Sequence, residues 1–176
     1  MLHPRRLPLT LIDTGDTNRY SGDVTDDIGY QREELEDLMP RSSGQALIAL
    51  AAMVTAVVPF LTDWNDTHVF NPQWLPHARF HTVTSLGMTA ILSPVALWLL
   101  WHRPDDPAAV TVAALIPLAY WAPFFAAAGV HGAAIEDPGR RLPRIGGIPT
   151  NLLGAGATTL TAGFGWYLDR RARSLT

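Results

Sequence analysis

Four apolar blocks after residue 43 constrain the fold of this chain more than any other feature. They lie at about 44–62, 76–101, 108–130 and 148–168, and the charged residues of this region are concentrated between them. Each block is close to the roughly 20 residues that a helix needs to cross a hydrocarbon core about 30 Å thick. Only a helix satisfies all its backbone hydrogen bonds within one segment in lipid, and no alternating pattern indicates a barrel. We therefore predict an all-α fold, a four-transmembrane-helix bundle.

A soluble bundle is the alternative, and it requires a polar face on every helix. The second and third blocks are apolar or small nearly all round, which disfavours it. The fourth block is the least apolar because it is rich in glycine and threonine. Small residues allow helices to approach closely, so we expect this block to lie against protein more than lipid.

Residues 1–43 form a polar, acidic tail. They carry nine acids and five arginines, a formal −4, whereas residues 44–176 carry seven acids and eight arginines, +1. One short helix is expected at residues 25–39, where acids in the first turn precede apolar residues at helical spacing. The rest of the tail is predicted to be largely disordered. The predicted domains are an acidic cytoplasmic tail, 1–43, and a four-helix membrane domain, 44–176.

The expected location is a membrane, which the chain crosses several times. The first residues lack the pattern of a signal peptide, and an even number of helices puts both termini on one side. Arginines near the helix ends number five on that side and four on the other, which favours cytoplasmic termini in the plasma membrane of a bacterium. The expected partners are the lipid bilayer, a lipophilic ligand and a cytoplasmic or membrane protein. A net acidic chain without a basic stripe argues against nucleic acid.

Polar and aromatic residues gather between the first two blocks, at 63–81. Pro76 stands where a helix can begin, so His77 and His81 lie four residues apart on one face of its first turns. The loop before them and the segment after the third block add imidazoles, carboxylates and guanidiniums at the same membrane face. The expected catalytic residues are His77, His81, Asp63 and Glu136. The expected substrate-binding residues are Arg79, His68, Asn71, Trp74, Tyr120 and Trp121.

Three interpretations of this gathering remain open. In the first, His77 or His81 is a general acid or base, Asp63 or Glu136 orients it, and Arg79 holds an anionic group. Ionisable groups at membrane depth are costly and mark functional sites, which favours this interpretation.

In the second interpretation, His77, His81 and His131 bind a divalent metal, Zn²⁺ or non-haem iron. In the third, the polar groups cap helix ends and bond the backbone at the interface, and the tryptophans are anchors. No phosphate loop, dinucleotide fingerprint or haem-attachment sequence is present, so no organic cofactor is expected.

Two prolines, Pro117 and Pro123, flank Tyr120 and Trp121 in the third block. Proline in a helix interior removes a backbone hydrogen bond and bends the helix, so a kink is expected there. Tyr120 and Trp121 at such a kink could wall a pocket for an apolar ligand, and simple packing is the alternative.

The string W-N-D-T-H-x-x-N-P-x-W-x-P-H-A-R-F-H, residues 64–81, resembles the signature of an uncharacterised family of small multipass membrane proteins. That resemblance implies a helical membrane fold and no particular reaction. In architecture alone, the chain also resembles the sterol-isomerase-like (emopamil-binding) membrane proteins, which use acids and a histidine beside an apolar cavity. The resulting hypothesis is an enzyme acting on a lipophilic small molecule by acid/base or metal-assisted chemistry. The alternative is a non-catalytic binding or accessory subunit of a membrane complex.

Overall fold

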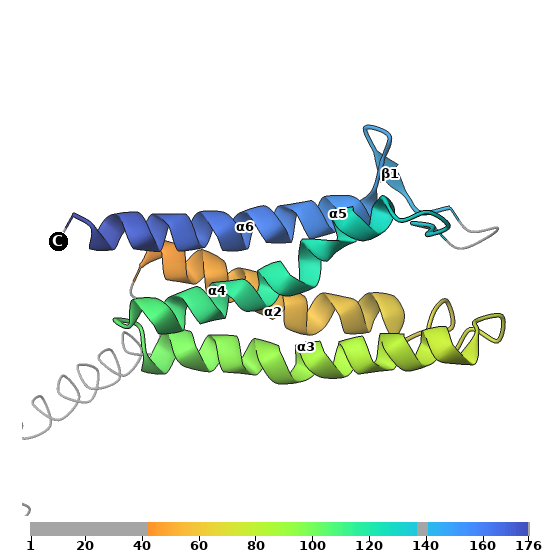
Figure 1. Ribbon diagram of the computed structural model, residues 1–176, viewed down its shortest axis with the longest axis horizontal. Coiled ribbons are helices and arrows are strands. Elements are labelled where there is room, and N and C mark those ends of the chain that lie inside the picture. The colour runs from red at the N-terminus through yellow and green to blue at the C-terminus, as the bar shows by residue number, and fades with distance from the viewer. Residues whose placement is uncertain (1–41, 137–140, 176) are drawn as a thin grey trace, which may run out of the picture. The chain divides into compact units, whose positions relative to one another are not determined.

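The computed structural model describes residues 42–136 and 141–175, and it is mostly helical. Helices occupy all four predicted blocks, and a two-residue antiparallel strand pair precedes the last helix (Figure 1). The predictions for the acidic tail, residues 1–41, lie outside the described residues. The elements are α2 (Ser43–Asp63), α3 (Pro76–His102), α4 (Pro107–Trp121), α5 (Pro123–Ala128), β1 (Arg144–Ile145), β2 (Ile148–Pro149) and α6 (Thr150–Arg173).

The helices begin where the sequence supplies caps or prolines. Ser42 caps α2 by accepting a hydrogen bond from the Gln45 backbone N–H at 3.1 Å. Asp106 caps α4 in the same way, accepting from the Ala108 N–H at 2.9 Å. Proline occupies the first position of α3, α4 and α5, where its missing N–H leaves no helical bond unmade.

The third predicted block is two helices rather than one. α4 ends at Trp121, and α5 starts again at Pro123 after the single residue Ala122. Pro123 has no N–H to continue the helical ladder, so the expected kink is present as a break. Figure 1 shows the change of direction between α4 and α5. Pro117 lies inside α4 and is buried there.

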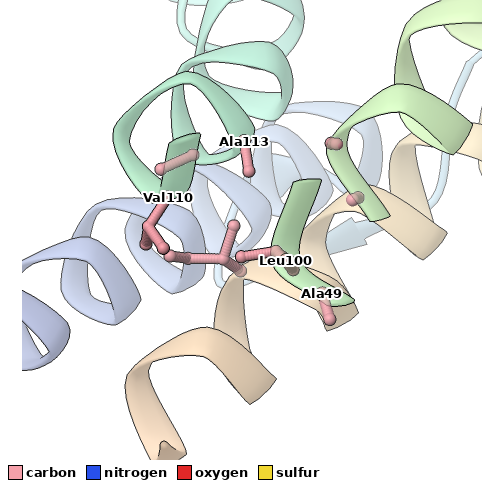
Figure 2. Close-up of a cluster of buried hydrophobic side chains, with 8 residues drawn as sticks. Ala49, Leu100, Val110 and Ala113 are labelled. Carbon is pink, nitrogen blue, oxygen red and sulfur yellow. The ribbon is translucent and has the colours of Figure 1, made fainter. Parts of the chain in front are cut away.

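The long helices run antiparallel in chain order and pack closely. α2 contacts α3, α4 and α6, and α4 also contacts α3 and α6. The core cluster is mostly alanine, which lets the helix backbones approach one another. Figure 2 shows this cluster, whose members are Ile48, Ala49, Ala52, Ala96, Leu100, Val110, Ala113 and Ala114.

Two glycines bring α2 and α6 into backbone contact. A Cβ added to Gly44 would lie 2.6 Å from the Asp169 nitrogen and 2.6 Å from the Gly165 oxygen. A Cβ added to Gly165 would lie 2.7 Å from the Gly44 oxygen and 2.9 Å from the Leu47 Cβ. Real side chains do not tolerate such distances, so both positions require glycine. The close packing expected of the fourth block is thus present, at this crossing.

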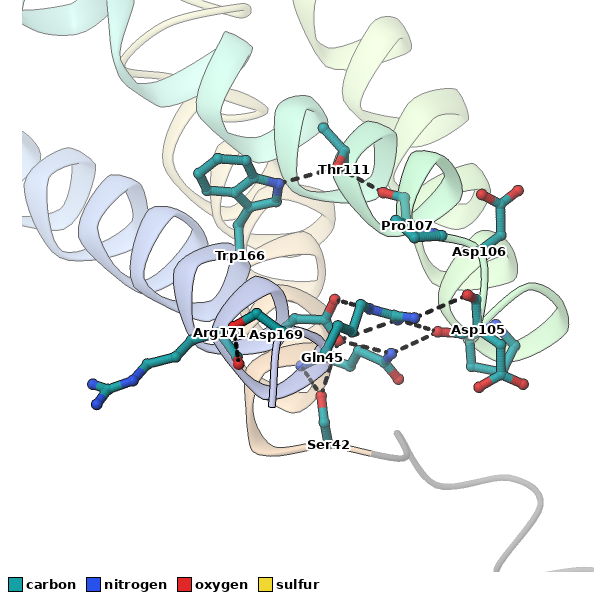
Figure 3. Close-up of polar contacts among 12 residues, drawn as sticks. Ser42, Gln45, Asp105, Asp106, Pro107, Thr111, Trp166, Asp169 and Arg171 are labelled. Carbon is teal, nitrogen blue, oxygen red and sulfur yellow. Dashed lines mark hydrogen bonds and ion pairs between the residues drawn. The ribbon is translucent and has the colours of Figure 1, made fainter. Parts of the chain in front are cut away.

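Beside the crossing, the buried carboxylate of Asp169 lies at the centre of hydrogen bonds that connect three helix ends (Figure 3). It accepts hydrogen bonds from Gln45 Nε2 at 3.0 Å and from Arg173 Nε at 2.7 Å. Gln45 also donates to the Pro104 oxygen at 2.8 Å, and Arg173 donates to the Asp105 oxygen at 2.9 Å. Hydrogen bonding to Asp169 raises the pKa of Arg173 above its ordinary value. These contacts fix the start of α2, the α3–α4 turn and the end of α6 together, and we call them the Asp169 network.

Three helical stretches are long and apolar enough to cross a membrane, judged by length and composition. They are α2, α3 and the α4–α5 stretch Pro107–Ala128. α6 is a 24-residue helix, but it does not meet the same test. The described part of the chain therefore has three candidate membrane spans, which indicates a membrane protein. The fourth predicted span stays a prediction.

The α2–α6 crossing predicts opposite effects for two neighbouring glycines of α6. Gly165→Ala forces a methyl group into the Gly44 backbone and is expected to cost about 1–3 kcal/mol of stability, typical of overpacking. Gly163→Ala meets nothing within 4 Å and should be neutral or stabilising by about 0.5–1 kcal/mol, because alanine favours helix more than glycine. Thermal unfolding of both variants in one detergent measures the difference. Equal melting temperatures would contradict the crossing.

Candidate functional site

A cleft of about 620 Å³ opens at the end of the helices remote from the Asp169 network. Its walls come from the end of α2, the start of α3, the α4–α5 break, residues 133–135 and the start of α6. Most of the lining is apolar. The lining residues are Asp63, His81, Thr82, Ser85, Met88, Ala119, Tyr120, Pro123, Phe124, Ala127, Ala128, Ala133, Ala134, Ile135, Asn151 and Leu152.

The local sequence explains why a cleft forms here. The break at Ala122 displaces α5 from the line of α4. Alanines line the cleft on α4, α5 and the segment that follows, and their small side chains leave space that larger residues would fill. Tyr120 and Phe124 form an aromatic wall, with ring centroids 6.1 Å apart. Tyr120 thus lines the cleft, and its role in binding a ligand stays a prediction.

A smaller apolar cavity of about 260 Å³ adjoins the cleft between α3 and α4. Met88, Ala119 and Tyr120 line both spaces. The two threonine hydroxyls at the inner cavity already have partners: Thr55 donates to the Ala51 oxygen and Thr89 to the Leu86 oxygen. The inner cavity therefore presents an apolar surface.

His81 brings an imidazole to the cleft and pairs it with His77. The two Nε2 atoms are 3.0 Å apart, and the rings meet edge to face. A hydrogen bond between them requires one Nε2 to donate and the other to accept, so the contact holds at most one additional proton. Both side chains are exposed, and His77 is not among the residues that line the cleft. The pair can therefore pass a proton between the cleft and its surroundings.

Polar groups from other elements face the same space. Asp63 ends α2, and Ser85 lies one turn beyond His81 on α3. Tyr120 has Ser85 and Asp63 as its polar neighbours. Asn151, in the first turn of α6, donates to the Ile135 oxygen at 3.3 Å and holds that wall of the cleft. Asn151 was not predicted as a site residue. Its sequence signal is a polar side chain near a helix start at the same membrane face.

Several other residues of the 64–81 motif contact one another. Arg79 donates from Nη2 to the Asn71 oxygen at 2.8 Å. The Asn71 side chain closes the loop by accepting from the Gln73 N–H at 2.9 Å. His68 Nδ1 lies 2.6 Å from the Thr67 hydroxyl, and its ring contacts Trp74 edge to face. The structure thus places all four outside the cleft lining: His68, Asn71 and Trp74 lie in a self-bonded loop, and Arg79 donates to that loop from α3.

Three other predicted residues also lie apart from the cleft lining. Glu136 forms an ion pair with Arg144 at 2.6 Å. Trp121 is buried and donates from Nε1 to the Thr55 hydroxyl at 2.8 Å, so it packs α4 against α2. His131 is exposed in the turn after α5. Of the four predicted catalytic residues, the cleft brings together His81 and Asp63, with His77 behind His81.

A metal site needs more donors than the histidine pair offers. Protein zinc sites use three or four side-chain ligands. His77 and His81 supply two imidazoles, but within residues 42–136 and 141–175 no group of three or more His, Cys, Asp or Glu is arranged to hold a metal ion. His131 does not complete such a group with them. The described side chains thus supply two imidazoles, fewer ligands than a zinc site uses.

The fold and the cleft define a helical protein with three candidate membrane spans and a mixed apolar and ionisable site. Residues 47–174 match the model of a family of unknown function, DUF6640, and the chain belongs to this family. No curated protein and no solved structure matches the chain. The expectation of an uncharacterised family is thus confirmed. The match assigns no activity and does not test the motif or the sterol-isomerase-like resemblance.

The internal bonds of the loop predict a local effect for Arg79→Gln. Losing a charged hydrogen bond to the Asn71 oxygen is expected to cost about 1.5–3 kcal/mol in the opening of residues 64–75. Arg144→Gln breaks a half-exposed ion pair and should cost at most about 1 kcal/mol. Hydrogen–deuterium exchange of the loop in detergent compares the two. Unchanged loop exchange in Arg79→Gln would show that Arg79 does not hold this loop.

Proposed function

We propose that this chain is a four-span membrane protein. In this proposal α6 crosses the bilayer with α2, α3 and α4–α5. Its 24 residues give a helix about 36 Å long, more than the hydrocarbon thickness. Its weak hydropathy is offset by close contact with α2 at Gly165. The charged residues Asp169 to Arg173 then lie at the membrane surface on the side of the termini, and in this proposal that side is the cytoplasm of a bacterium.

Within this fold, the protein is an enzyme that transfers protons to and from a lipophilic small molecule bound in the cleft. The observation that carries this proposal is the position of His81. Its imidazole lines a mostly apolar cleft together with the Asp63 carboxylate, and its Nε2 contacts that of His77. Mostly apolar pockets with a few converging polar groups are typical of small-molecule sites. An imidazole is the side chain best suited to exchange protons near neutral pH.

The chemistry assigns one role to each group. Protonated His81 donates a proton to the ligand, and His77, exposed behind it, resupplies that proton from water. Asp63 accepts a proton that the ligand loses elsewhere. One proton enters and one leaves, which is the balance of an isomerisation. The architectural resemblance to sterol-isomerase-like proteins agrees with this reaction class.

A non-catalytic binding or accessory subunit is the second candidate. The observation that favours it is the self-bonded loop: the side chains of Arg79, Asn71 and His68 form their hydrogen bonds with residues of that loop. In that case the histidines stabilise the membrane face, and the cleft retains a ligand unchanged. Both candidates require a ligand in the cleft. If the protein is an enzyme, His81→Gln abolishes the conversion of that ligand while the ligand is still retained; if it is a non-catalytic subunit, there is no conversion to lose.

Retained ligand tests the cleft directly. Native mass spectrometry of the detergent-purified protein should show bound lipophilic molecules. Ala127→Trp fills the cleft and should abolish their retention, whereas Ala126→Trp, on the same helix but outside the lining, should not. Circular dichroism checks that both variants fold. Equal retention in the two variants, or none in the wild type, would contradict the proposed function.

A further inference from the structure

The polar groups of the cleft also indicate which head group a ligand would have. Asp63 is the one acid or arginine among the described residues that line the cleft or the inner cavity. Within residues 42–136 and 141–175 it forms no ion pair. Two arginines at this face are committed elsewhere: Arg79 donates to the Asn71 oxygen, and Arg144 pairs with Glu136. The cleft thus offers a carboxylate that has no guanidinium partner among the residues the structure describes.

A negative head group would meet this carboxylate at short range. Like charges in a partly apolar site repel strongly because little water screens them. The histidine pair cannot fully compensate, since its Nε2 contact holds at most one additional proton. A hydroxyl or a protonated amine would instead donate a hydrogen bond to Asp63, and charge-assisted hydrogen bonds are the stronger ones. The charge of the site therefore selects against carboxylate and phosphate heads.

The shape of the site indicates the rest of the molecule. The cleft and the inner cavity are adjacent, since Met88, Ala119 and Tyr120 line both, and the lining of the inner cavity includes Thr55. Asp63 and Thr55 are eight residues apart on α2, or about 12 Å along the helix axis. An extended chain gains roughly 1.2 Å per backbone bond, so about ten carbon–carbon bonds span this depth. The hydroxyls at the inner end are already bonded, which suits an apolar tail.

We infer that the cleft and inner cavity bind a single-chain amphiphile whose head donates hydrogen bonds to Asp63 and carries no negative charge, a hydroxyl or a protonated amine. This inference rests on the proposed ligand site and deepens it by naming the ligand class. The head lies at the wide, polar end beside His81, and the tail extends between α3 and α4. The head is thereby placed within reach of the groups proposed to exchange protons.

The chain contains no cysteine, so one introduced thiol is a clean reporter. The probe variant is Ala127→Cys, in the cleft lining, and the matched control is Ala126→Cys, outside it. The rate of alkylation by N-ethylmaleimide is measured in membrane vesicles with dodecylamine, dodecan-1-ol or dodecanoate at equal, non-lytic concentration. The control reports any effect of the amphiphiles on the bilayer itself.

Dodecylamine, dodecan-1-ol or both should slow alkylation at position 127 several-fold, and dodecanoate should not. Protection by dodecylamine alone indicates a site for a cationic head, and protection by dodecan-1-ol alone indicates a site for a neutral head. When Asp63→Asn is combined with Ala127→Cys, dodecylamine should protect the thiol at position 127 less, and dodecanoate should protect it. Three results would overturn the inference. With Asp63 intact, dodecanoate protects as well as the other two amphiphiles, or none of the three protects; or the ranking of the three amphiphiles by protection is the same in Asp63→Asn as with Asp63 intact. If ligand retention still depends on position 127, only the head-group inference fails; if it does not, the proposed function fails as well.

Discussion

The backbone contact between α2 and α6 is the constraint on which the rest of this structure depends. Gly44 and Gly165 meet so closely that neither position has room for a Cβ. The Asp169 network lies beside this contact and connects α2 and α6 to the turn between α3 and α4. A buried carboxylate is costly unless it is paired and hydrogen-bonded, and here Gln45 and Arg173 meet that requirement. One end of the helices is therefore tightly specified.

The opposite end is organised differently. There the proline break separates α5 from α4, and small side chains leave the cleft open. At the end that holds the Asp169 network, the Asp169 carboxylate accepts hydrogen bonds from Gln45 and Arg173, whereas Asp63 and His81 face the open space at the other end. A tightly packed end combined with an open end that has converging polar groups is typical of a scaffold that supports a binding site. The inner cavity extends the open end toward the packed core.

Local sequence patterns predicted the parts of this molecule that depend on local chemistry. Hydropathy located the helices, since burial in lipid or protein requires long apolar stretches. The prolines predicted the break near Ala122, and the i, i+4 spacing predicted the contact between His77 and His81. In each case the residues involved are neighbours along one helix. The close packing of the glycine-rich last helix was also predictable from its composition.

The parts that depend on distant pairing were not predicted. Asp169 and Gln45 are 124 residues apart, and nothing in either segment indicates the other. The cleft is lined by alanines that look like ordinary membrane-helix residues, and Asn151 reaches it only because α6 folds back beside Ile135. The guanidinium of Arg79, expected to bind a substrate, donates to the Asn71 oxygen in the preceding loop, a contact that the sequence did not indicate.

Deuterium incorporation tests the central claim, proton transfer to a lipophile by His81, without knowledge of the substrate. Membranes containing the protein are incubated in D₂O with a lipid extract, returned to H₂O and analysed by mass spectrometry. Proton transfer to carbon predicts a lipophilic species that retains one added mass unit after back-exchange, with the wild type and with His131→Gln but not with His81→Gln. Failure of any lipophile to gain deuterium with the wild type, or an equal gain with His81→Gln, would contradict the account.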